Sequence, residues 1–115
     1  IDMFGSTEEK IARLVKRGKW EKIKSKYLYS SGPDELCMLA RACGQSSSDD
    51  SVNVLVALLN ATDQKVVLEA LNSLGDVGTD HAVANLQLMF QEADPNNKEL
   101  KNAIQNTLNK IRNRK

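Results

Sequence analysis

Apolar residues recur along the chain at intervals of three and four, the spacing that puts side chains on one face of an α-helix. The pattern predicts helices over about 7–17, 20–29, 33–43, 50–60, 64–74, 81–93 and 95–112. Residues suited to cap a helix precede three of them: Ser6 or Thr7, Thr62 or Asp63, and Thr79 or Asp80. Because no segment alternates with a period of two, no strand is predicted.

The sequence also repeats itself, with a shift of 31 residues. Residues 35–44 align with 66–75, and the same shift carries 51–59 onto 82–90 without a gap. Residues 103–111 match 66–74 at a shift of 37, and the six additional residues fall in the preceding loop. Each unit is a helical hairpin that cannot bury both of its faces alone, so neighbouring units are expected to stack.

We therefore predict one all-α domain over residues 1–115, a right-handed α–α superhelix of about three helical hairpins plus a C-terminal helix. Its expected parts are a flexible segment 1–6, a degenerate first hairpin 7–32, repeats 33–60 and 63–93, and a closing helix 95–112. The closing helix has asparagines away from its apolar stripe, at 102, 106, 109 and 113. Such a polar face is typical of a terminal, water-facing helix.

The segment 70–86, ALNSLGDVGTDHAVANL, joins the end of one helix to the next through a glycine-containing turn. It resembles the HEAT-like repeats of the phycobilisome-lyase type, and the matching residues are Ala70, Leu71, Leu74, Gly75, Asp76, Gly78, Asp80, Ala82, Val83 and Leu86. The resemblance is strong over 63–93, fair over 33–60 and partial over 98–112. It implies a short HEAT-like solenoid, and such repeats mostly serve as binding surfaces for varied partners.

The two glycines of this turn raise the question of a phosphate site. Their spacing lacks both the GxxxxGK[ST] and the GxGxxG pattern, no strand precedes them, and the neighbouring acidic residues would repel phosphate. We instead interpret Gly75 as the left-handed residue that ends one helix. Gly78 then lets the chain reverse into the next helix, which Thr79 or Asp80 would cap.

No other pattern points to catalysis, a cofactor or a metal site. His81 is the single histidine and is expected to be an exposed first-turn residue. Cys37 and Cys43 are six positions apart on one predicted helix and so diverge; Cys43 fits the core, and a reactive thiol remains open for Cys37. We predict a protein that is not an enzyme and has no catalytic, cofactor-binding or metal-binding residues.

The sequence predicts a cytoplasmic location. The unpaired cysteines favour a reducing compartment. No apolar run approaches the ~20 residues of a membrane-spanning helix. A signal peptide is not apparent either.

Positive charge is concentrated in residues 10–26, where eight Lys and Arg residues are opposed by Glu21 alone. Such a segment is either the solvated face of two short helices or a patch for nucleic acid, anionic lipid or an acidic protein. The net charge is +4 over residues 1–32, −8 over 33–97 and +5 over 98–115. The acidic middle disfavours nucleic acid. The charge segregation predicts weak self-association, with basic ends docking on the acidic middles of neighbouring copies.

We predict a module that binds an as yet unidentified protein partner through its concave helices or its basic N-terminal hairpin. In HEAT-like solenoids the second helix of each hairpin generally lines the concave side. The candidate residues on those helices are Asn53, Val56, Asn60, Asn85, Gln87 and Gln91, and those in the basic segment are Lys16, Arg17, Lys19 and Lys22. Two alternatives stay open: a lyase or lyase-associated subunit, implied by the resemblance, and nucleic-acid or anionic-surface binding through 10–26.

Overall fold

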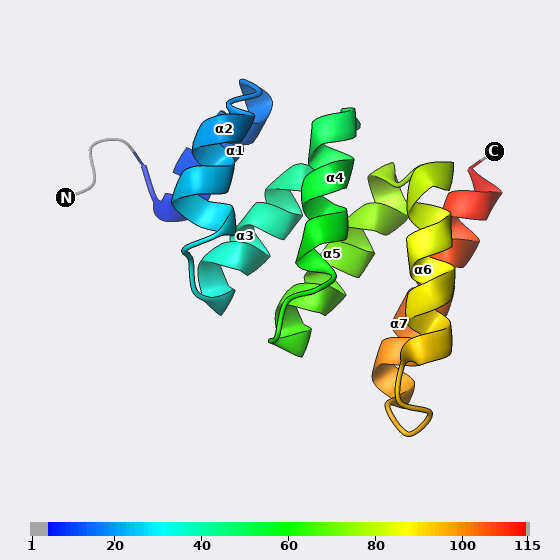
Figure 1. The fold of residues 1–115 in the computed structure, drawn as a ribbon. Coiled ribbons are helices and arrows are strands. Elements are labelled where there is room, and N and C mark those ends of the chain that lie inside the picture. The colour runs from blue at the N-terminus through cyan, green and yellow to red at the C-terminus, as the bar shows by residue number, and fades with distance from the viewer. Residues whose placement is uncertain (1–4, 115) are drawn as a thin grey trace.

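The computed structural model describes residues 5–114; part of the N-terminal segment 1–6, namely residues 1–4, lies outside the described residues, as does residue 115. The described chain is all-α and has no strand. Its elements are α1 (Thr7–Lys16), α2 (Trp20–Ile23), a π-helix η1 (Lys24–Leu28), α3 (Pro33–Cys43), α4 (Asp49–Leu58), α5 (Gln64–Val77), α6 (Asp80–Glu92) and α7 (Lys98–Asn113) (Figure 1). Every helix predicted from the apolar spacing is present, with bounds that agree within three residues.

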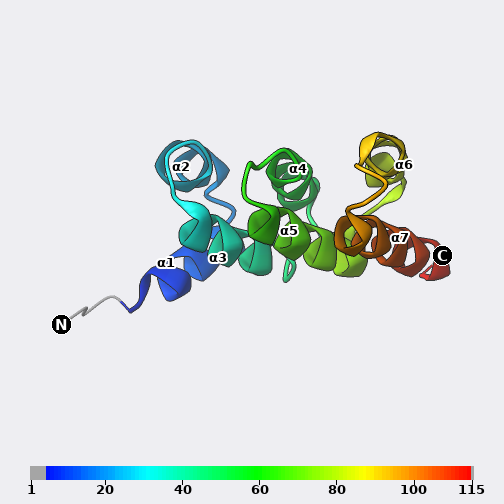
Figure 2. The same ribbon diagram turned by 90° about the horizontal axis from the view of Figure 1, so that it is seen from below.

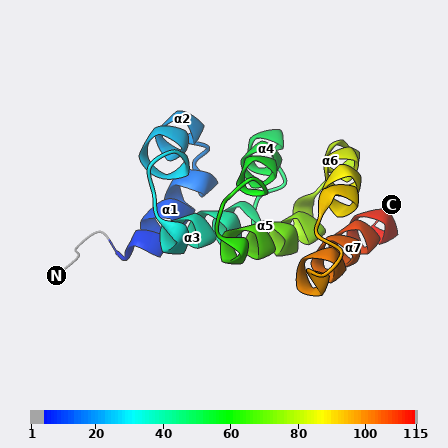
Figure 3. The same ribbon diagram turned by 60° about the horizontal axis from the view of Figure 1, so that its bottom comes forward.

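The helices form a solenoid with two layers. Helices α1, α3, α5 and α7 pack side by side in one continuous layer, whereas α2, α4 and α6 stand apart from one another on the other side (Figure 2 and Figure 3). A stack whose helices are closer together in one layer bends toward that layer. We call the layer of α1, α3, α5 and α7 the inner layer and that of α2, α4 and α6 the outer layer.

The prediction that helices 50–60 and 81–93 line the concave side is therefore wrong, because α4 and α6 belong to the widely spaced outer layer. The reason lies in the phase of the repeat. Helix α3 contacts both η1 before it and α4 after it, so each inner helix could pair with either neighbour. A periodic sequence shows the length of the unit but does not show which helix begins it.

The core lies between the two layers and is built from aliphatic side chains. The largest fully buried ones are Ile11, Ile23, Leu39, Leu55, Leu71, Leu74, Leu86, Ile104 and Ile111. Leu55 and Leu86, which are 31 positions apart in the sequence, are both completely buried. The repeat is thus a repeat of core positions, as the stacking of hairpins requires.

Small and hydroxyl-bearing residues let the inner helices approach closely. A Cβ atom at Gly44 would lie 2.5 Å from Oγ of Ser73, so only glycine fits there. The buried Ser73 hydroxyl donates a hydrogen bond to the Ala40 carbonyl at 2.7 Å, which ties α5 to α3. At the next junction the Thr107 hydroxyl donates to the Leu71 carbonyl at 2.9 Å. Ala40 and Leu71 occupy the same repeat position. At both junctions, therefore, a hydroxyl group of the next inner helix donates to the backbone carbonyl at that repeat position.

One of the two glycines in the turn at 75–78 has a different role from that predicted. Gly18, with φ +67°, is a left-handed residue that follows the end of α1. Gly75, however, is not a left-handed helix end: α5 continues through it to Val77. Gly78 caps α5 in an extended conformation, and a Cβ there would lie 2.5 Å from the Leu74 carbonyl oxygen. The turn at residues 75–78, considered above as a possible phosphate site, is bound by another part of the same chain. The Arg114 guanidinium donates hydrogen bonds to the carbonyls of Gly75 and Gly78.

Two of the predicted caps are present and one is not. Ser6 and Glu9 form a reciprocal capping box at the start of α1. The Asp63 carboxylate accepts from the Lys65 backbone N–H at 2.9 Å at the start of α5. Thr79 occupies the N-cap position of α6 but makes no side-chain capping hydrogen bond, and Asp80 is the first helical residue.

The second predicted helix, 20–29, is regular only in its first turn. Beyond Ile23 the chain widens into the π-helix, where the Tyr29 N–H donates to the Lys24 carbonyl at 3.2 Å, five residues back. In this arrangement Ile23 and Tyr27 are both buried, while Tyr29 is 76% exposed. Single π-turns of this kind are rare.

Candidate functional site

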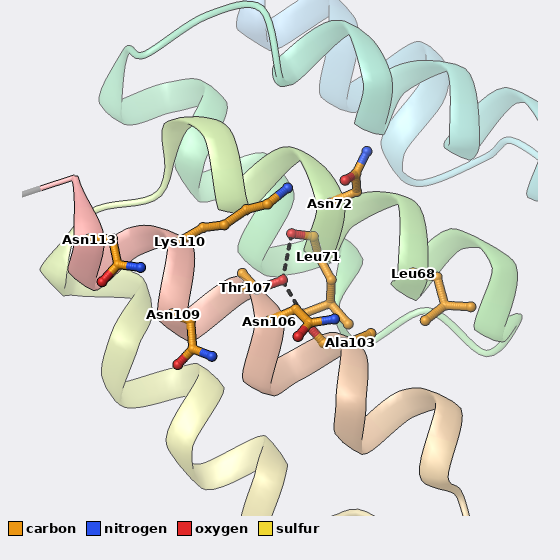
Figure 4. A pocket seen from close by; sticks show the side chains of 9 residues that line it. All are labelled: Leu68, Leu71, Asn72, Ala103, Asn106, Thr107, Asn109, Lys110 and Asn113. Atoms are coloured by element: carbon orange, nitrogen blue, oxygen red, sulfur yellow. Dashed lines mark hydrogen bonds between the residues drawn. The ribbon is translucent and has the colours of Figure 1, made fainter.

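The inner layer has a groove between α5 and α7, which we call the inner groove. Its volume is about 470 Å³, and its lining residues are Leu68, Leu71, Asn72, Ala103, Asn106, Thr107, Asn109, Lys110 and Asn113. Figure 4 shows the asparagine side chains and Lys110 around this groove, with Leu71 and Thr107 joined by a hydrogen bond beneath them. Lys110 is the only charged residue among those that line it.

A second hollow of about 480 Å³ extends the inner groove toward the N-terminal end of α5. The two hollows share Leu68 and Asn72, so they form one trough along the helix. The charged residues of this second hollow already have partners in the chain. Lys65 pairs with Asp34 at 3.0 Å, and the Glu99 carboxylate accepts from the Gln64 amide at 2.9 Å.

The repeat explains why the groove opens between α5 and α7. Arg41, Asn72 and Asn109 occupy the same repeat position on three successive inner helices. Arg41 bridges Glu8 of α1 at 3.2 Å and Glu69 of α5 at 3.3 Å, and hydrogen bonding to Glu8 raises the pKa of Arg41. These ion pairs cover the surface from α1 to α5. The shorter, neutral asparagines leave the surface between α5 and α7 open.

Most of the amides in the inner groove have no partner within the described chain. Asn72, Asn106 and Asn113 make no hydrogen bond through their side chains, and all three are exposed. The Asn109 oxygen accepts from the Gln105 amide at 3.0 Å, which leaves the Asn109 NH₂ group available. An asparagine amide offers both a donor and an acceptor. The groove therefore presents paired donors and acceptors above an apolar floor.

The sequence contained a signal for this groove that the prediction did not use. Asparagines 102, 106, 109 and 113 were interpreted as the water-facing side of a terminal helix, yet three of them line the inner groove. Asn72 and Asn109 follow a leucine at the same repeat position, in LNSL and LNKI. A polar residue that recurs at the same repeat position, next to a core leucine, indicates that these polar side chains lie on the same face of successive helices.

The outer layer has a smaller groove, between α4 and α6, which we call the outer groove. It brings together three of the residues predicted to bind a partner, Val56, Asn60 and Asn85. The volume is about 270 Å³, and the other lining residues are Leu59, Leu88, Met89, Glu92, Ala93 and Leu100. Leu88, one of these lining residues, is 53% exposed.

The remaining predicted residues are not brought together with these. Asn53 lines a hollow of about 320 Å³ at the edge of the solenoid, beside Asp49, Thr79 and His81. Gln87 and Gln91 are exposed on α6 but do not line the outer groove. The four basic residues, Lys16, Arg17, Lys19 and Lys22, are exposed around the turn between α1 and α2.

The groups able to carry out chemistry are either buried apart or dispersed. Cys37 and Cys43 are free and buried. Burial raises the pKa of the Cys37 thiol, and it raises the pKa of Cys43 to about 12, so both thiols stay protonated at neutral pH. His81 is exposed in the first turn of α6, as predicted. Within residues 5–114 no group of three or more His, Cys, Asp and Glu residues is placed to hold a metal ion.

None of the helices between residues 5 and 114 has the length and apolar character needed to cross a membrane. No curated protein and no solved structure matches the chain significantly. The profile of the HEAT repeats does match, over residues 25–109, which is most of the chain and spans η1 to α7. HEAT repeats generally act as non-catalytic scaffolds that mediate protein–protein interaction. With its stacked helices and its repeated core positions, this chain belongs to the HEAT repeat family.

Proposed function

We propose that the protein is an interaction module whose inner groove binds an extended segment of a partner protein. The observation that carries this proposal is the set of amides on Asn72, Asn106 and Asn113, which line the groove and have no partner in the described chain. An extended peptide presents backbone N–H and C=O groups that require such partners. The trough along α5 and α7 has the elongated form of that ligand.

The other residues of the groove support the same kind of ligand. Leu68 is partly exposed and provides apolar contact for alternate side chains of a bound segment. Lys110 is exposed, forms no ion pair with the described residues and would favour an acidic side chain or a terminal carboxylate. Because Lys110 is the single charged lining residue, the groove does not resemble a catalytic pocket in which ionisable groups converge. A chromophore-lyase role consequently rests on the motif at 70–86 alone.

The outer groove is a second candidate surface, favoured by the exposure of Leu88. The side chains of Val56, Leu59 and Met89 are partly exposed around it. Apolar anchors in a groove between two helices suit the apolar face of a partner's amphipathic helix. Asn60, Asn85 and Glu92 would form its polar rim.

Peptide selection can distinguish the two surfaces. Peptides would be selected from a random display library on the wild-type protein, and their affinities measured by fluorescence anisotropy. We expect the substitutions Asn72→Ala and Asn106→Ala together to weaken binding by about tenfold or more, because each removes hydrogen bonds worth about 0.5–1.5 kcal/mol.

The matched control is the pair Asn60→Ala and Asn85→Ala, which removes two amides from the outer groove. It should leave the affinity of the same peptides unchanged. If the control pair abolished binding and the inner-groove pair did not, the outer groove would be the binding surface. Peptides insensitive to both pairs would refute binding at either groove.

A further inference from the structure

The turns that join inner to outer helices lie along one edge of the solenoid. These are the turns between α1 and α2, between α3 and α4 and between α5 and α6, and they form the upper edge in Figure 1. The C-terminal end of α7 lies on the same edge (Figure 1). Segments far apart in the sequence are thus aligned in one row.

The charged residues along this row are grouped by sign: a basic turn, two acidic turns and a basic C-terminal end. The first turn is basic, with exposed Lys16, Arg17, Lys19 and Lys22 opposed by Glu21. The second and third turns are acidic, with exposed Asp49 and Asp50, then Asp76 and Asp80. The row closes on Arg112 and Arg114 of α7, which are exposed and basic.

The first two blocks are not neutralised by other residues between 5 and 114. The four basic residues of the first turn form no ion pair with the described residues, and neither do Asp49 and Asp50. Asp49 and Asp50 occupy the first turn of α4, where the helix dipole already stabilises negative charge. Both carboxylates are exposed at the edge.

We propose that this edge is a self-association surface, on which the basic first turn of one copy docks on the acidic second turn of another. The occupant is a second copy of this chain, because the chain itself carries the complementary block next to the basic one. A two-fold axis between the copies makes the contact reciprocal, so each copy supplies one basic and one acidic turn.

The order of the blocks disfavours any contact in which two edges overlap along their whole length. If two antiparallel edges overlapped along their whole length, the basic first turn would face Arg112 and Arg114 of the other copy, and the acidic turns would face one another. Parallel overlap likewise opposes equal charges. Pairing the first turn with the second, in both directions, brings opposite charges together throughout the contact.

Nucleic acid fits this edge less well than a second copy does. A duplex that contacted the basic first turn and followed the edge would next meet four aspartates, whose charge opposes phosphate. A second copy presents opposite charges in matching order. If the edge instead serves nucleic acid or an acidic peptide, the protein by itself should remain a monomer in the experiment below.

Sedimentation velocity on the wild-type protein gives the first test. The mass should rise with protein concentration at about 20 mM salt and return to the monomer at about 500 mM, since the Debye length shrinks from roughly 20 Å to roughly 4 Å over that range. A wild-type protein that stays monomeric at low salt and millimolar protein concentration would overturn the proposal.

Charge reversal gives the second and sharper test. A basic-turn variant, with Lys16→Glu, Arg17→Glu and Lys19→Glu, and an acidic-turn variant, with Asp49→Lys and Asp50→Lys, should each be monomeric at low salt. Mixed in equal amounts, they should restore a one-to-one heterodimer, because one then has a mainly acidic pair of turns and the other a mainly basic pair. Failure of the mixture to associate would contradict the reciprocal contact.

A control separates position from net charge. Asp76→Lys with Glu92→Lys changes the net charge by the same amount as the acidic-turn variant but leaves the first two turns intact, so it should associate like the wild type. Equal loss in this control would refute the proposed register. Circular dichroism would verify folding, and the milder pair Asp49→Asn and Asp50→Asn keeps the test available if lysine destabilises α4.

Discussion

The inner and outer layers both contain completely buried leucines, such as Leu39 and Leu86, but they pack in different ways. In the inner layer, Gly44 and the hydroxyls of Ser73 and Thr107 allow neighbouring helices to touch and to share hydrogen bonds. In the outer layer, α4 and α6 rest mainly on inner helices and barely contact each other. Small and hydroxyl-bearing residues at the junctions thus accompany the close packing of the inner helices.

The two layers also offer different surfaces to a partner. On the surface of the inner layer Arg41 is held by two ion pairs, whereas Asn72, at the next repeat position, makes no side-chain hydrogen bond to the described residues. The spacing of the outer helices leaves apolar side chains such as Leu88 in water. The inner groove is therefore suited to a peptide backbone and the outer groove to an apolar helix face.

The largest expected effect comes from truncating a leucine in the closely packed region. Leu74 of α5 is completely buried, so Leu74→Ala should lower the free energy of unfolding by about 2–5 kcal/mol. Leu88 of α6 is 53% exposed, so the control Leu88→Ala should change it by less than about 0.5 kcal/mol. Urea denaturation followed by circular dichroism measures both, and similar losses would contradict the different burial of the two leucines.

A smaller effect is expected from enlarging the junction between α3 and α5. Gly44→Ala should lower the free energy of unfolding by about 1–3 kcal/mol, because the added Cβ meets the buried and hydrogen-bonded Ser73. The control is Gly32→Ser, where a Cβ would meet no atom within 4 Å and serine is a favoured N-cap residue. The control should be neutral or slightly stabilising; a neutral Gly44→Ala would show that the inner layer can expand.

The titration of Cys43 gives a measure of burial at the end of α3. Burial raises the pKa of this thiol from 9.0 to about 12, so the folded protein keeps a proton that the unfolded chain releases. The associated stability is complete below pH 9 and is lost as the pH rises from 9 to about 12, by at most about 1.4 kcal/mol per pH unit.

This pH dependence is measured as a difference between two proteins. Lysines and tyrosines titrate in the same range in the wild type and in Cys43→Ala, so their contributions cancel when the two unfolding curves are subtracted. The wild type should lose stability more steeply than Cys43→Ala over this interval. Parallel curves would mean that water reaches the thiol and that this part of the core is open.

The smallest effect should come from one hydrogen bond between inner helices. Thr107→Val removes the hydroxyl that donates to the Leu71 carbonyl and should lower the free energy of unfolding by about 0.5–1.5 kcal/mol. Thr62→Val removes an exposed hydroxyl and should change it by less than about 0.5 kcal/mol. An unchanged stability in Thr107→Val would indicate that close approach alone holds the inner layer.

Much of the architecture could be predicted because it depends on local or periodic information. The spacing of apolar residues located every helix, and the shift of 31 identified stacked hairpins. The caps at Ser6 and Asp63 follow from side-chain chemistry one turn away. The prediction failed at Gly75, which was assigned a left-handed helix end but lies within α5, and Lys110 of α7 lies against it.

The sequence alone determined that this chain is all-α and that it repeats, because helical periodicity and the need to bury one face are encoded within each segment. Tertiary structure decided which layer is concave, which asparagines share a groove and which charges align along one edge. These depend on how closely neighbouring helices approach, and that distance is set by pairs of residues about 30 positions apart, such as Gly44 and Ser73.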